Sequence, residues 1–165
     1  MDAGQARTRF KEARVARLAT VDESGRPHLV PMVFVVLGET IYSAVDAKPK
    51  STTSLRRLAN VRVHSAVAVL VDRFDDTDWT ALWWVRADGT ARVLDVAGAD
   101  TADTIQAAQI AEGVSAIDAL VRRYAQYREQ RPAGPVLAID VERWSGWAAS
   151  TTPAAPPTPS DDVNG

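Results

Sequence analysis

Two of the three lysines in this chain flank a single proline, in the tripeptide Lys48-Pro49-Lys50. The side chain of lysine is a compact, flexible point charge that suits phosphate groups. Ser51 and Thr52 follow at once, and a helix-like run begins a few residues later. A strand, then this loop, then a helix is typical of an anion site at a helix N-terminus. The segment therefore predicts a phosphate cradle, and the alternative is a solvated loop with an ordinary helix cap.

Five further side chains have types that suit contact with a flat polar ligand, and each also has a plain structural alternative. His28 follows Gly-Arg-Pro, where its ring could donate to a cofactor oxygen or ring nitrogen, or simply lie half exposed. Tyr42 and Ser43 could contact a cofactor, although a tyrosine in a strand more often packs. Trp84 and Arg86 share one strand face by alternation. Trp84 could stack on a flat ring or close a dimer interface, or it could pack in the core. Arg86 either reaches the ligand of a partner subunit or lies exposed.

The composition excludes several classes of chemistry. The 165 residues contain no cysteine, which removes disulfides, thiolate nucleophiles and cysteine-based metal sites. Only two histidines occur, without the spacing of a metal site, so we expect no metal. The net charge of −2 argues against a protein that coats nucleic acid, and no apolar run is long enough to span a membrane. We expect a soluble cytoplasmic protein whose partners include neither nucleic acid nor a membrane.

The hydrophobic pattern predicts strands in the first hundred residues and helices after them, which is a mainly β fold with peripheral helices. The expected helices are an entry helix over 3–13, a short helix over 53–60, and two helical pieces over 99–130 that break near Gly113. The expected strands are residues 15–21, 28–37, 40–44, 65–71, 81–87, 90–95 and 136–141. Meanders and hairpins of this kind favour a closed or partly closed antiparallel barrel.

Three local signals shape the expected strand connections. Gly38-Glu39 is a two-residue turn with glycine first, so that the strands up to residue 44 form a three-strand meander. Pro31 inside the second strand indicates a sheet edge or a bulge. Asp88-Gly89 lies between two strand-like runs, which is the strongest local signal for a hairpin and would place Arg86 opposite Ala91.

Residues 1–148 are long enough to form one domain with its own core. Residues 149–165 hold four prolines among Thr, Ala and Asp, and we expect a disordered tail whose deletion leaves stability and cofactor affinity unchanged. No G-x-G-x-x-G or G-x-x-x-x-G-K motif occurs, so the domain encodes neither a Rossmann dinucleotide site nor a P-loop.

Several short motifs occur in an order that resembles the split-barrel flavoprotein superfamily, whose best-known member is pyridoxamine-5′-phosphate oxidase. The segments that carry the resemblance are 14–22, 25–28, 30–31, 42–46, 48–50, 58–61, 70–72, 78–79, 82–86 and 141–147. In particular, Tyr-Ser-Ala-Val-Asp, Lys-Pro-Lys and Trp-Trp-Val-Arg follow one another in this order. Together they look like the F420-dependent branch of that superfamily, over roughly residues 9–147.

The resemblance implies a six-stranded antiparallel split β-barrel, similar to the FMN-binding barrels, that forms a homodimer with cofactor sites at the subunit interface. It implies a phosphate site formed by Lys48, Lys50, Ser51 and Thr52. It implies ring contacts along two strands from Ala19, Thr20, Pro31, Met32 and Val33. Aromatic anchors for the subunit contact would come from Trp79, Trp83 and Trp84.

The cofactor implied by the resemblance is FMN or the deazaflavin coenzyme F420. The residues after Pro31 carry no cation, and the chain lacks the ending typical of pyridoxamine-phosphate oxidase, which weakens the case for FMN. Arg56 and Arg57 would extend the lysine cations towards the acidic tail of F420. We expect an oxidoreductase that uses F420 to transfer a hydride to an unidentified small organic substrate. The alternatives are an FMN-dependent enzyme and a non-catalytic protein that binds a flavin, a deazaflavin or a haem-like ligand.

Overall fold

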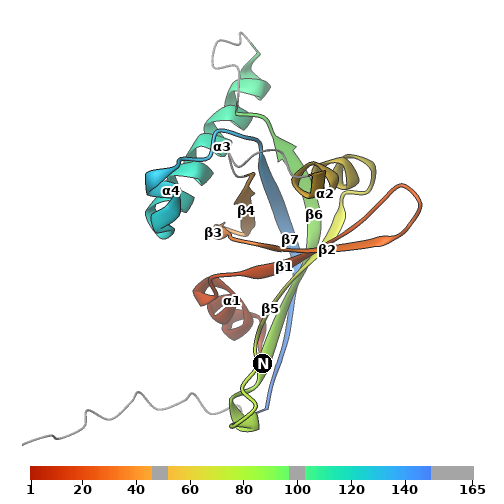
Figure 1. The fold of residues 1–165 in the computed structure, drawn as a ribbon, viewed down its shortest axis with the longest axis vertical. Helices are drawn as coiled ribbons and strands as arrows, with labels where there is room; N and C mark the ends of the chain where they lie inside the picture. Colours follow the sequence, from red (N-terminus) through yellow and green to blue (C-terminus); the bar gives the residue numbers. More distant parts are fainter. Residues whose placement is uncertain (46–51, 97–102, 150–165) are drawn as a thin grey trace, which may run out of the picture.

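The computed structural model describes residues 1–45, 52–96 and 103–149, in which an antiparallel sheet is flanked by helices (Figure 1). The strands are β1 (Ala16–Val21), β2 (Pro27–Met32), β3 (Val35–Leu37), β4 (Thr40–Ala44), β5 (Ala66–Arg73), β6 (Trp83–Leu94) and β7 (Val136–Ala148). The helices are α1 (Ala3–Glu12), α2 (Thr52–Val63), α3 (Thr104–Arg123) and α4 (Ala125–Glu129), with a 3-10 turn at Trp79–Ala81. The predicted mainly β fold with peripheral helices is confirmed.

The order of strands in the sheet explains how the barrel closes. The strands lie in the order β2-β1-β5-β6-β7-β4-β3, so β2 and β3 are the two edges. These edges are nearly continuous in the chain, because β2 ends at Met32 and β3 begins at Val35. Three residue steps span at most about 10 Å, so the sheet must curl until its two edges approach each other. Pro31 lies in the edge strand β2, as its missing N–H group favours.

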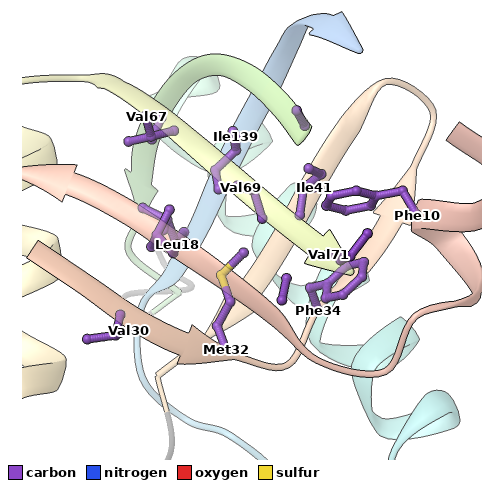
Figure 2. Packing of buried hydrophobic residues seen from close by; sticks show 14 of the residues in the cluster. Phe10, Leu18, Val30, Met32, Phe34, Ile41, Val67, Val69, Val71 and Ile139 are labelled. Atoms are coloured by element: carbon purple, nitrogen blue, oxygen red, sulfur yellow. The ribbon is translucent and has the colours of Figure 1, made fainter. Parts of the chain in front are cut away.

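One apolar cluster fills the barrel interior. The strand residues labelled in Figure 2 are Leu18, Val30, Met32, Ile41, Val67, Val69, Val71 and Ile139. α1 adds Phe10, whose ring centroid lies 5.0 Å from that of Phe34. α2 adds Leu58 and Val61, and Figure 1 shows α1 and α2 on opposite sides of the β1–β2 pair. Each such side chain contributes about 1.5–3 kcal/mol on burial, so both helices are part of the barrel core.

α3 covers part of the outer face of the same sheet. Its residues Ala116, Ile117 and Leu120 are buried in a second apolar cluster. The sheet supplies Tyr42 from β4 and Leu94 from β6 to this cluster. Because side chains alternate between the two faces of a strand, these residues point away from the barrel interior. The sheet is therefore packed on both faces where α3 lies.

The predicted hairpin at Asp88-Gly89 is wrong. Residues 83–94 form the single strand β6, in which Asp88 pairs with Ala68 of β5 and with Arg143 of β7. The register against β7 shifts between Asp88 and Gly89, which is a β-bulge. A Cβ atom at Gly89 would overlap the carbonyl oxygen of Asp140, so glycine permits a close approach of two backbones. The Asp-Gly pair therefore lies in a long strand, opposite a bulge whose extra residue is Glu142 of β7, rather than in a turn.

Two other strand predictions differ from the structure. The strand expected over 28–37 is divided into β2 and β3, which lie at opposite edges of the sheet. The expected three-strand meander is therefore wrong, and the described residues form seven strands rather than six. The last strand, expected over 136–141, continues to Ala148. The tail expected over 149–165 lies outside the described residues, apart from Ala149.

The predicted break near Gly113 is also wrong. α3 runs through Gly113 without interruption, and the break falls at Tyr124, between α3 and α4. A Cβ atom at Gly113 would lie 2.5 Å from Cγ1 of Val96, so glycine allows α3 to approach the chain after β6. The hydroxyl of Tyr124 donates to backbone oxygens of Phe34 and Arg14, which ties the end of α3 to the barrel.

Candidate functional site

The buried polar side chains of the described residues gather on α2 or beside it. They are Thr20, Ser43, Arg57 and Asn60. Burying a polar group costs free energy unless hydrogen bonds compensate for lost water. A group of buried polar residues in an otherwise apolar barrel is therefore the first place to look for a binding site.

α2 supplies two of these residues from one of its faces. Arg57 and Asn60 are three positions apart, and side chains at this spacing lie on the same side of a helix. Leu58 and Val61 hold the helix against the barrel core. The Nη2 group of Arg57 donates to the backbone oxygen of Ala44 at 3.5 Å, which connects α2 to the end of β4.

Thr20 connects α2 with the first hairpin. The Nδ2 group of Asn60 donates to Oγ1 of Thr20 at 2.9 Å. The same Oγ1 lies 3.4 Å from Nδ1 of His28, its cross-strand partner on β2. Thr20 and Asn60 are almost completely buried, whereas His28 is half buried. The structure therefore brings two predicted site residues, Thr20 and His28, into one hydrogen-bonded group with Asn60.

The predicted phosphate residues Lys48, Lys50 and Ser51 lie outside the described residues. The backbone of Thr52 begins α2, so the segment 46–51 directly precedes the helix that carries Arg57 and Asn60. The two cations predicted on that helix lie in different environments, because Arg56 is exposed whereas Arg57 is buried. The two adjacent arginines therefore do not form one exposed cationic stripe.

The remaining predicted ring contacts do not share one face of the barrel. Met32 points into the core, whereas Pro31 is exposed and Val33 is half buried against the second apolar cluster. Ala19 points outward and lies beside Leu29 and Ala68 on neighbouring strands. A ligand that contacts all of these residues would have to reach both faces of the β1–β2 hairpin.

Tyr42 lies outside the barrel, in a network under α3. Its hydroxyl group donates to Oε1 of Glu112 at 2.7 Å, and Arg92 pairs with Glu112 at 2.7 Å and with Asp140 at 2.9 Å. Burial, followed by the hydrogen bond to Glu112, raises the pKa of Tyr42. Arg92 lowers the pKa values of Glu112 and Asp140 through its hydrogen bonds. This network fastens α3 to the sheet, and Ser43 points to the opposite face.

Trp84 and Arg86 lie on an exposed part of the outer face. Trp84 stands directly opposite Trp147 of β7. Arg86 pairs with Asp88 at 2.9 Å, and Arg143 donates to the same carboxylate at 2.8 Å. The alternation predicted for this strand is confirmed, since the neighbouring Trp83 packs against the interior cluster.

Sequence reasoning missed Asn60, Arg143 and Trp147 as candidate site residues. Asn60 had a usable signal, because a polar residue between Leu58 and Val61 falls on the apolar side of a short helix. Arg143 and Trp147 had none, because their partners on β6 become known only with the register of two strands far apart in sequence.

Within the described residues, no three His, Asp or Glu side chains come together in a way that could hold a metal ion. In the same part of the chain, no helix is both long and apolar enough to cross a membrane. These findings add no second candidate site to the one around α2.

The fold and sequence define the class of this protein. Residues 3–148 match the family model described as pyridoxamine 5′-phosphate oxidase. The chain belongs to this family, and the resemblance to the pyridoxamine-5′-phosphate-oxidase superfamily is confirmed, whereas its F420-dependent branch stays a prediction. No curated protein sequence matches the chain.

Solved structures with a similar fold include proteins whose descriptions name different ligands. A FAD-binding protein from Mesorhizobium loti has a TM-score of 0.63 at 19% identity, over 88% of this chain and 94% of that chain. The haem storage protein HutZ from Vibrio cholerae has a TM-score of 0.57 at 17% identity, over 90% and 95%. The FAD-binding protein from Mycobacterium smegmatis has a TM-score of 0.53 at 19% identity, over 88% and 93%. At these identities the likeness establishes the shared fold alone.

Proposed function

We propose that this protein is a cytoplasmic, homodimeric oxidoreductase that uses coenzyme F420 to transfer a hydride to a small organic substrate. The observation that carries the proposal is the group of buried polar residues around α2, the helix that directly follows Lys48-Pro49-Lys50. Membership of the pyridoxamine 5′-phosphate oxidase family supports a cofactor with a phosphate and a flat ring system. Similarity to two FAD-binding proteins supports a ring of the flavin type.

The polar groups of the described residues have the chemistry that such a ring requires. His28 offers a half-buried hydrogen-bonding group at the edge of the core, next to the buried pair of Thr20 and Asn60, and a flavin-type ring needs donors and acceptors along one edge. When bound, a deazaflavin supplies hydride transfer in a two-electron step. The chain supplies position and exclusion of water, because Leu58 and Val61 on α2 close the core beside these groups. The phosphate would be held by Lys48, Lys50, Ser51 and Thr52.

The exposed part of the outer sheet face supports the proposed dimer. Leu29, Trp84 and Trp147 are large apolar side chains that remain exposed on β2, β6 and β7. Paired aromatic residues of this kind are frequent anchors of subunit contacts. A second copy would bury them, and it would bring Arg86 near a cofactor held by its neighbour.

Two other cofactor assignments follow from particular observations. FMN has a single phosphate for Lys48 and Lys50 to bind, and the family named after pyridoxamine-phosphate oxidase supports a flavin in general. A haem-like ligand without turnover is favoured by the similarity to HutZ and by one half-buried histidine, His28, beside the core. Titration of the protein with F420 and with FMN side by side separates the first of these from F420.

Lysine substitutions test the phosphate site. We expect Lys48→Ala or Lys50→Ala to weaken F420 binding by about 1–3 kcal/mol, because each removes a charge-assisted hydrogen bond to phosphate. Lys11→Ala removes the only other lysine, in α1, and serves as the matched control with no expected effect. Affinity is measured by fluorescence quenching at low and high salt. If both lysine variants bind as tightly as the control, the phosphate site does not lie in this segment.

A further inference from the structure

The side chains of Asn60, Thr20 and His28 form a chain of hydrogen bonds in which the donor and the acceptor of each bond can be assigned. The amide nitrogen of Asn60 donates to Oγ1 of Thr20 at 2.9 Å. Both side chains are at most 5% exposed, so water does not compete for this bond. A hydroxyl group that accepts from an amide still has its own proton to donate.

The proton of the Thr20 hydroxyl group has one side-chain acceptor among the described residues. This acceptor is Nδ1 of His28, which lies 3.4 Å from Oγ1. The distance is long, so the contact orients the ring more than it stabilises the fold. An imidazole nitrogen that accepts a hydrogen bond carries no proton, and in the neutral ring the proton is then on Nε2.

We infer that Asn60 and Thr20 fix the tautomer of His28, so that its Nε2–H group is presented as a hydrogen-bond donor to a carbonyl oxygen or an unprotonated ring nitrogen of the cofactor. This inference rests on the proposed function for the identity of the ligand, but not for the tautomer. Thr20 and Asn60 are positioning residues, because they act through the imidazole ring.

Two tyrosine hydroxyl groups near the barrel are already engaged. The hydroxyl group of Tyr42 donates to Glu112 under α3, and that of Tyr124 donates to backbone oxygens. The Nε2 atom of His28 makes no hydrogen bond to the part of the chain that the structure describes. A half-buried imidazole with one nitrogen held by the protein therefore has its other nitrogen available for a ligand.

The tautomer is measured directly by ¹⁵N NMR of the ligand-free protein at alkaline pH, where the imidazole is neutral. We expect a pyridine-like resonance for Nδ1 of His28 and a pyrrole-like resonance for Nε2. Asn60→Asp replaces the amide donor by a carboxylate that only accepts, so the Thr20 hydroxyl group must turn towards it. The hydroxyl oxygen then accepts from Nδ1–H, and the two resonances exchange character. Thr20→Ser keeps the hydroxyl group and serves as the matched control with the wild-type pattern.

Two results would overturn the tautomer assignment. One is a pyrrole-like Nδ1 in the wild-type protein, and the other is an unchanged tautomer in a folded Asn60→Asp variant. If that variant does not fold, as circular dichroism would reveal, the wild-type and Thr20→Ser spectra still decide the assignment, because they show directly which nitrogen is protonated.

The ligand contact is tested separately with FMN and with F420 as probes. We expect Asn60→Asp and His28→Phe to lower the affinity for the better-bound probe roughly three- to tenfold, and Thr20→Ser to leave it unchanged, as expected for one neutral hydrogen bond. Unchanged affinity in the first two variants overturns the donor role. If the wild-type protein binds neither probe, the proposed function and the donor role both fail, whereas the tautomer is still decided by NMR.

Discussion

The outer face of the sheet consists of two halves that differ in what covers them. On the half under α3, the outward residues Tyr42 and Leu94 are 7% and 1% exposed. On the other half, the outward residues Leu29, Trp84 and Trp147 are 65%, 38% and 48% exposed. The strands β6 and β7 run through both halves, and the bulge at Asp88-Gly89 lies where one half gives way to the other.

This difference indicates that one half of the continuous sheet supports the fold of the chain, whereas the other half is available for contact. The half under α3 is completed within the chain by apolar packing and by the Arg92 network. The open half presents paired tryptophans and an arginine pair around Asp88 without a covering helix in the described residues. An exposed pair of large apolar side chains such as Trp84 and Trp147 is typical of a contact surface, which is why we propose a second subunit as the partner of the open half.

The bulge at the boundary gives the largest expected effect. We expect Gly89→Ala to destabilise the fold by about 4 kcal/mol, because its Cβ atom meets the backbone of Asp140 and cannot move aside. Gly4→Ala in α1 is the control, since its Cβ atom would lie 3.3 Å from the flexible carboxylate of Asp2. Urea unfolding measures both variants. Equal stability of the two would mean that the bulge does not constrain β6 against β7.

Truncating a leucine to alanine should lower the free energy of unfolding more on the covered half than on the open half. We expect Leu94→Ala to cost about 3 kcal/mol, because it leaves a cavity between α3 and β6. Leu29→Ala, on the open half, should change the stability of the isolated chain by less than about 0.5 kcal/mol. Denaturant unfolding at low protein concentration compares the two. Similar losses would remove the distinction between the halves.

The open half should matter for association instead. We expect Trp84→Ala and Trp147→Ala each to weaken dimerisation by about 2 kcal/mol, as for aromatic anchors of an interface that buries well over ~1,000 Å². Ile105→Ala removes an even more exposed apolar side chain, which lies on α3, and should have no effect. Sedimentation measures the three variants. A wild-type protein that sediments at 17.8 kDa at micromolar concentration contradicts the assignment.

The charged network under α3 gives the smallest expected effect, with a defined pH dependence. Arg92 lowers the pKa values of Glu112 and Asp140 below their ordinary values of 4.5 and 3.8. Their contribution to stability is therefore complete above those ordinary values and disappears as the pH falls through the lowered ones. Glu112→Gln should cost about 1 kcal/mol at neutral pH, because the pair is half exposed, and the difference should vanish at acid pH. Melting curves from neutral pH to about pH 3 follow the change, and a constant difference would exclude the charged pairing as its cause.

Local sequence signals predicted most of the helices and strands but not which strands pair with one another. The turn at Gly38, whose φ is 61°, and the edge position of Pro31 follow from the backbone limits of single residues. Asp88-Gly89 led to the wrong prediction of a hairpin, because glycine occurs both in tight turns and at close backbone contacts. Only the approach of the Asp140 backbone decides between the two. Gly113 misled for the same reason, since α3 needs it to pack beside Val96.

The candidate site was predictable only in part for a related physical reason. Thr20 and His28 were predicted one by one, and their pairing followed from the first hairpin. Asn60 completes the group through tertiary packing of α2, which local pattern does not determine. The division of Arg56 and Arg57 into an exposed and a buried residue likewise depends on how α2 rests on β4.

The central claim, that this barrel binds F420, is tested most directly by titrating the purified wild-type protein with F420 and with FMN side by side. We expect tighter binding of F420 at low salt, because Lys48, Lys50 and Arg56 can attract its acidic tail as well as its phosphate. The advantage should shrink as salt rises, since dissolved ions screen the attraction between such charges. If the protein copurifies with FMN, or binds FMN more tightly than F420 at low salt, the assignment of F420 is wrong.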